Sequence, residues 1–162
     1  MNGNKIKYRL AMIVALSLTI LLAACDWDGG TQVTRYQDLR LQFQTNRTHA
    51  GPGDQVQMHF TVTNTGKQPV QINSQNGPVL NIKVFDVNGG EILFSWAALH
   101  PDQAATQLMW QPGETKTIDA AWTPTQQEYY SGRSVNLEGY LNEGTEIVQA
   151  AGMQACLGTC ER

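Results

Sequence analysis

Histidine is the residue best suited to acid–base catalysis or metal binding, together with neighbouring carboxylates. The three histidines of this sequence are scattered along the chain. His49 and His59 lie ten positions apart, and His100 stands beside Pro101 and Asp102. A zinc-binding helix of the His-Glu-x-x-His type needs two histidines four positions apart, and this spacing does not occur. The Gly-x-Ser-x-Gly turn that exposes a nucleophilic serine is also absent. The sequence therefore predicts no enzymatic activity, no metal and no cofactor.

The first 24 residues have the layout of an export signal. Lys5, Lys7 and Arg9 form a basic start, and a 15-residue apolar run follows from Leu10 to Ala24. A basic region before a short apolar run is typical of secretory signals. The run is also shorter than the roughly 20 residues that a permanent membrane-spanning helix needs. We predict that residues 1–24 are a cleaved signal peptide.

The cysteine after this run is placed to accept a lipid. Leu22-Ala23-Ala24-Cys25 resembles the lipobox that lipoprotein-processing enzymes read. Buried acyl chains such as palmitate contribute roughly 0.8 kcal/mol per CH₂, so two or three chains hold a small domain on a membrane. The mature protein is predicted to begin at lipidated Cys25, anchored on the extracytoplasmic face of the cell membrane. Asp26 resembles an inner-membrane retention signal and predicts the inner membrane if the host has two.

The two remaining cysteines, Cys156 and Cys160, lie four positions apart near the C-terminus. A structural zinc site needs four ligands, commonly two such pairs, and the chain has one pair. A disulfide is the default outside the cytoplasm, and a loop this small would stabilise the fold little. We predict a disulfide between them, with a reduced tail as the alternative.

The composition of the mature chain restricts its partners. Without the signal, 138 residues remain, which is the length of one domain. The signal holds three of the 11 Lys and Arg residues, so 8 remain against 14 Asp and Glu, a balance of −6. A nucleic-acid partner would require the opposite sign. We therefore exclude nucleic acid and expect the membrane, through the lipid, and a protein as partners.

Apolar residues after position 38 alternate with polar ones with a period of two, which indicates β-strands. Asn88-Gly89-Gly90 is a hairpin signal, and Pro112-Gly113 predicts a type II turn. Strands at this spacing are typical of an all-β sandwich or barrel. We predict a flexible tether over 25–38, a sandwich over 39–150 and a tail over 151–162. The nine predicted strands contain residues 39–43, 56–62, 70–72, 80–87, 92–96, 108–110, 117–122, 135–141 and 147–150.

Several of these segments resemble BsuPI-type proteinase inhibitor domains. The stretch from Gly53 to Gly66, GDQVQMHFTVTNTG, followed by Pro69-Val70, resembles the opening of that family. The similarity covers roughly residues 38–141 and implies an immunoglobulin-like antiparallel sandwich, here of eight or nine strands. It also implies inhibition of a serine proteinase, without assigning any reactive-site residue. Later matches are Val84-Phe85-Asp86 with Gly90-Glu91, an aromatic at Trp96, and Gln111-Pro112-Gly113-Glu114 followed by Trp122.

Loop lengths suggest where a protein partner would bind. If every strand crosses the sandwich, the long connections 45–54, 74–79, 97–106 and 123–133 all lie at the end away from the membrane. Long loops on a rigid sandwich are common binding sites. The predicted partner-binding residues on these loops are Arg47, His49, Asn76, His100, Asp102, Gln126, Tyr129 and Tyr130.

Two other functions stay open at this point. One is a structural or assembly module of the cell envelope, and the other is a carbohydrate-binding sandwich. A sugar platform needs exposed aromatic rings on one flat face, whereas Trp96, Trp110 and Trp122 follow strand patterns and are predicted to pack in the core or at its edge. Buried rings at these positions would remove the sugar platform.

Replacement of the lipid-accepting cysteine tests the anchor. We expect Cys25→Ser to abolish incorporation of radiolabelled palmitate and normal processing, because the serine hydroxyl does not replace the thiol as lipid acceptor. Equal labelling of wild type and variant would contradict a lipid on Cys25.

Overall fold

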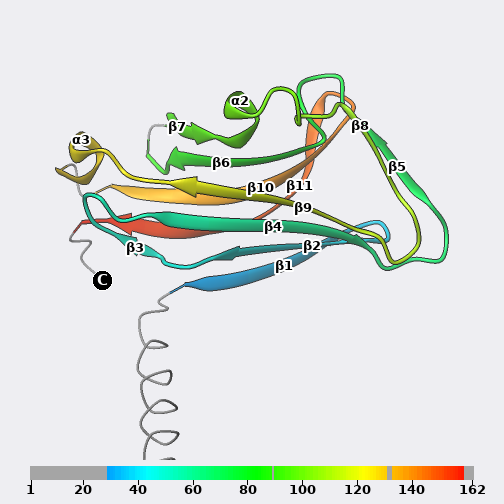
Figure 1. The fold of residues 1–162 in the computed structure, drawn as a ribbon, viewed down its shortest axis with the longest axis horizontal. Coiled ribbons are helices and arrows are strands. Elements are labelled where there is room, and N and C mark those ends of the chain that lie inside the picture. The colour runs from blue at the N-terminus through cyan, green and yellow to red at the C-terminus, as the bar shows by residue number, and fades with distance from the viewer. Residues whose placement is uncertain (1–28, 89, 131–132, 159–162) are drawn as a thin grey trace, which may run out of the picture.

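The computed structural model describes residues 29–158 apart from 89, 131 and 132. The predicted signal peptide, Cys25, Asp26 and Cys160 lie outside these described residues. No described helix is long and apolar enough to cross a membrane. The described strands form two facing sheets and a small third sheet, with the strands of the two large sheets running along the long axis of the molecule (Figure 1).

The first large sheet contains four antiparallel strands in the order β1-β2-β4-β9. Alternate residues of its central strands point into the sandwich, as in the run Val56, Met58, Phe60 and Val62, all of which are buried. The period of two therefore sets which face is buried. The strand bounds are β1 (Gly30–Tyr36), β2 (Leu39–Thr45), β4 (Val56–Asn64) and β9 (Thr115–Trp122).

The second large sheet has the strand order β3-β11-β10-β6-β7. Its strands are β3 (His49–Ala50), β11 (Glu146–Leu157), β10 (Ser134–Glu143), β6 (Leu80–Asp86) and β7 (Ile92–Ser95). The third sheet pairs β5 (Val70–Asn73) with β8 (Gln107–Trp110). Two short helices, α2 (Trp96–Leu99) and α3 (Gln126–Tyr130), complete the described elements.

These sheets confirm the predicted all-β, immunoglobulin-like sandwich. Each of the nine predicted strands is present in the structure, except that β6 ends at Asp86 and that Trp96, predicted as the end of a strand, begins helix α2. The predicted type II turn is also present, because Gly113 has a φ of +78° and the Glu114 N–H donates to the Gln111 carbonyl at 2.9 Å.

The predicted tether boundary is wrong at its C-terminal side. Residues Gly30–Tyr36, within the predicted tether 25–38, form strand β1, which pairs with β2 through a hairpin turn at Gln37 and Asp38. β1 is an edge strand with no buried residue. Because its side chains bury so little, the sequence carries no apolar face there that alternation could reveal.

The predicted tail boundary is also wrong, because β11 continues through most of residues 151–162 and ends at Leu157, which is fully buried. Small residues hide this half of the strand in the sequence, including Ala151 and Gly152. A Cβ added at Gly152 would overlap the Leu137 carbonyl oxygen of β10, so the close packing of these two strands requires glycine.

The long loops do not gather at one end, contrary to the sequence prediction. Loops 45–54 and 123–133 both lie at the end of the sandwich where β11 finishes. This follows because Val56 pairs with Trp122 and His49 pairs with Cys156. Loops 74–79 and 97–106 lie at the opposite end, where the Val79 N–H donates to the Ala105 carbonyl. The reason is that β5 and β8 pair with each other instead of crossing the sandwich (Figure 1).

A glycine of the second sheet lies directly against an aromatic ring of the first sheet. A Cβ added at Gly139 of β10 would overlap the aromatic ring of Phe60, which is fully buried in the facing sheet. We expect Gly139→Ala to lower the free energy of unfolding by about 1–3 kcal/mol through overpacking. In a Phe60→Leu background the same change should cost less, because the smaller side chain leaves room. Urea unfolding of the double-mutant cycle measures this coupling, and strictly additive effects would contradict it.

Candidate functional site

The sandwich is open along the side where β9 forms the edge of the first sheet. Two adjoining hollows lie there, between β9 on one side and β7, α2 and the following loop on the other, and the larger one also reaches residues of β2 and β4; their volumes are about 680 and 390 Å³. Apolar residues line much of the larger hollow, including Met58, Phe94 and Leu99. His100 and Asp119 line both hollows, so these residues mark the boundary between the two.

Helix α2 forms one wall of this groove and is held in place by the side chain of Asn81. The side chain of Asn81, buried in β6, accepts the Ala97 N–H through Oδ1 at 3.0 Å and donates through Nδ2 to the Ser95 hydroxyl at 3.2 Å. The Ser95 side chain makes no capping hydrogen bond. The Asn81 carboxamide therefore satisfies an N–H of the first helical turn that would otherwise lack a partner.

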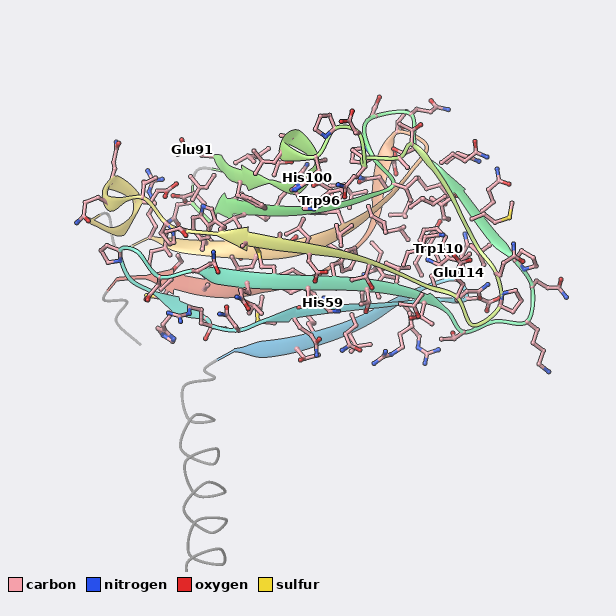
Figure 2. All side chains as sticks on the ribbon, in the orientation of Figure 1. His59, Glu91, Trp96, His100, Trp110 and Glu114 are labelled. Carbon is pink, nitrogen blue, oxygen red and sulfur yellow. The ribbon has the colours of Figure 1, made fainter. Side chains whose placement is uncertain are left out.

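His100 ends α2 with a fixed ring orientation. Its imidazole stacks on Trp96 with ring centroids 5.0 Å apart, and Figure 2 shows the two residues side by side near α2. Its Nδ1 lies 2.9 Å from the Trp96 carbonyl oxygen. A carbonyl oxygen only accepts, so Nδ1 carries the proton and Nε2 of the neutral ring is left as an acceptor.

The opposite wall carries two pairs of charged or ionisable groups. The Asp119 carboxylate contacts Nδ1 of His59 across the β4–β9 pair, on the exposed face of the sheet. Near the other end of β9, Lys116 Nζ lies 2.6 Å from Glu114 Oε1 and sits over the Trp110 ring. The hydrogen bond from Lys116, helped by the Gln111 N–H, lowers the pKa of the Glu114 carboxyl. Exposed pairs of this kind contribute little to stability.

The structure separates the predicted partner-binding residues. Arg47, bound to Asp54 at 2.9 Å, and His49 lie at the end where β11 finishes. Gln126, Tyr129 and Tyr130 lie on α3 at that same end. Asn76 donates to the Thr145 carbonyl at the opposite end, and His100 and Asp102 follow α2. The prediction of one surface made by all eight is therefore wrong, and only His100 lines the groove.

The three tryptophans considered for a carbohydrate-binding platform are buried, so they do not form an exposed aromatic face. Trp96, Trp110 and Trp122 are all buried, with Trp110 fully inaccessible, and this confirms the prediction that they pack in the core or at its edge. Among the residues that the structure describes, no three His, Cys, Asp or Glu side chains are grouped so that they could hold a metal ion.

Of the three cysteines, only Cys156 lies among the described residues. Cys156 is buried in β11 and is disulfide-bonded. Cys160, like Cys25, lies outside the described residues, so the predicted pairing of Cys156 with Cys160 and the lipid on Cys25 stay predictions.

Sequence reasoning missed most of the groove. Met58 and Phe94 were assigned to strands, and Leu99 was part of a loop, with nothing in the sequence to show that they meet. One signal was present, because Leu99 is a large apolar residue in a polar connection, and it is 65% exposed in the structure.

Comparison with known proteins identifies no family. No family model matches the chain, and no curated protein matches it. Solved structures resemble it only distantly. The CARDB domain of a Pyrococcus furiosus protein is 16% identical, with 78% of this chain and all of that one covered and a TM-score of 0.45. Spo0M, a sporulation control protein from Bacillus subtilis, is 12% identical, with 77% of this chain and 51% of that one covered and a TM-score of 0.49.

The hydrogen bonds of Asn81 give a test of how α2 is positioned. Asn81→Ala leaves the Ala97 N–H and the Ser95 hydroxyl without this partner, and we expect a loss of about 1–3 kcal/mol in unfolding free energy. The ring-current shift that Trp96 imposes on His100 in NMR spectra should also shrink. The control Ser95→Ala removes one neutral hydrogen bond and should cost less, with the ring-current shift retained. Equal stability losses with an unchanged shift would contradict this role.

Proposed function

We propose that this chain is a lipid-anchored, extracytoplasmic domain that binds another protein in the groove beside β9. The observation that carries the proposal is the combination of two adjoining hollows with a partly apolar lining at an open edge of the sandwich. Small groups of polar residues within a largely apolar concave surface are typical of binding sites. The lipobox at Leu22–Cys25 supports the anchor.

The anchor would hold the domain close to the membrane. Strand β1 begins at Gly30, so four residues separate it from Cys25, in place of the 13 residues, 26–38, that the sequence prediction put between Cys25 and the first strand. The five Cα–Cα steps from Cys25 to Gly30 span at most about 17 Å when fully extended. A partner of this domain would therefore be a protein that is itself at or near the membrane surface.

Proteinase inhibition is the narrower form of this proposal. It is supported by the resemblance of residues 38–141 to BsuPI-type domains, which implies a serine proteinase as the partner. Addition of the full chain to an assay of a subtilisin-type serine proteinase tests this form separately. Loss of proteolysis in proportion to the added chain is expected, and full proteolysis would leave protein binding without inhibition.

Substitution in the larger hollow tests the binding surface. We expect Leu99→Arg to abolish capture of the partner from detergent-solubilised membranes, because it places a charge in an apolar wall of the groove. The matched control is Met109→Arg, on β8, which is also exposed but lines neither hollow. Quantitative mass spectrometry should find the same protein with wild type and control and lose it with Leu99→Arg. Identical capture by all three would contradict the groove as the binding surface.

A further inference from the structure

We infer that the partner contributes an extended segment that pairs with β9 as a fifth strand of the first sheet. This inference rests on the proposed function and specifies the kind of partner that the groove receives. Strand addition combines main-chain hydrogen bonds along a free edge with pockets for alternate side chains. The groove offers both features.

The free main-chain groups of β9 belong to its odd-numbered residues. The Asn64 N–H donates to the Glu114 carbonyl one position beyond the Thr63–Thr115 pair, so the first bond in register with the β4–β9 ladder lies at an even-numbered residue of each segment. Hydrogen-bonded pairs recur at every second residue of an antiparallel ladder. Residues 116, 118, 120 and 122 therefore bond to β4, and Thr117, Asp119 and Ala121 direct their N–H and C=O groups away from it.

The other side of β4 gives an independent check of this parity. The Asn46 N–H donates to the Gln57 carbonyl and the Thr65 N–H donates to the Asp38 carbonyl, so the odd residues of β4 face β2. Its even residues must then face β9. Outside the strand ladders, the part of the chain that the structure describes makes no main-chain hydrogen bond to Thr117, Asp119 or Ala121, and β9 is the last strand of its sheet on that side.

The hollows define the chemistry of the added segment. Side chains of an added strand that point inward would meet Phe94, Leu99 and Ala120 in the larger hollow and Trp96 with Ile118 in the smaller one. Those that point outward would continue the exposed face that carries Thr117 and Asp119. The segment is therefore one in which aliphatic residues alternate with polar residues, without proline at positions that donate to β9.

The shape of the groove favours a single segment over a second copy of this chain. Residues of both β9 and α2 line the same hollows, so the space beside β9 is bounded on its far side by the same molecule. A second copy would have to bring its own α2 and β7 alongside its β9. Neighbouring strands lie about 4.8 Å apart, and one extended segment needs no more than that width.

A pair of proline variants tests the parity. Ala121→Pro removes an N–H that faces the free edge, and we expect it to fold with a melting temperature close to that of wild type. Ala120→Pro removes an N–H of the β4–β9 ladder and should lower the melting temperature sharply. Ala121→Thr adds a side chain at the same position, keeps the N–H and serves as the control for binding.

The probe is a phage-displayed library of random nonapeptides, selected against the full lipidated chain in detergent micelles. We expect enrichment of segments with alternating aliphatic and polar residues. Their affinity should fall at least about tenfold for Ala121→Pro, which corresponds to about 1.4 kcal/mol, and remain for Ala121→Thr. Amide exchange at Thr117, Asp119 and Ala121 should slow on binding, with the residues between them unchanged.

Three outcomes would overturn the inference. The first is that the selected peptides bind wild type and Ala121→Pro with equal affinity. The second is that no peptide of the library binds wild type more strongly than it binds Ala121→Pro. The third is a dimer in sedimentation that Ala121→Pro dissolves, because a second copy would then occupy the edge. The proposed function fails separately, if no membrane protein is captured in a manner that depends on Leu99.

Discussion

The buried carboxamide of Asn64 holds together the segments on which the position of β9 depends. Its Nδ2 donates to the carbonyl oxygens of Gln68 at 2.7 Å and Trp110 at 3.2 Å, and its Oδ1 accepts the Gly66 N–H at 2.9 Å. The indole Nε1 of Trp110 returns a hydrogen bond to the Val62 carbonyl at 2.9 Å. A fully buried amide is costly unless its donors and acceptor are satisfied, so these bonds fix the path of the chain out of β4 and back into β9.

The two edges of the sandwich differ because only one of them has a covering strand. On one side β1 packs against β11, where the Gly152 N–H donates to Gln32 Oε1 at 3.0 Å and the Tyr36 hydroxyl donates to Glu143 at 2.6 Å. On the other side β9 and β7 are the edge strands of their sheets. The short helix α2 after β7 does not cover β9, and the groove lies between β9 and α2. An exposed edge strand invites pairing with another chain, so the uncovered edge at β9 is where recognition by main-chain hydrogen bonds is available.

The sequence predicts where the strands lie but not which strands pair with each other. Alternation located β4 from Val56 to Val62, because each inward residue is apolar and each outward residue is polar. The same period in Val70 and Ile72 led to the prediction of a strand that crosses the sandwich, since alternation reports which face is buried and not which strand lies alongside. The groove could not be predicted for the same reason, because Phe94 and Ala120 meet only through the arrangement of the two sheets.

The start of β1 determines how the domain stands relative to the membrane. Gly30 pairs with Thr45, which places the first strand residue at the end that carries loops 45–54 and 123–133. The proposed lipid on Cys25 would make this end face the membrane, because so few residues lie between, and Arg47, His49 and α3 would then lie on the membrane side. A soluble partner would find these loops shielded. The groove, in contrast, is lined by residues of β9, a strand that runs along the long axis of the domain (Figure 1). A segment entering it would therefore lie along the strands of the domain, on a surface that the membrane does not cover.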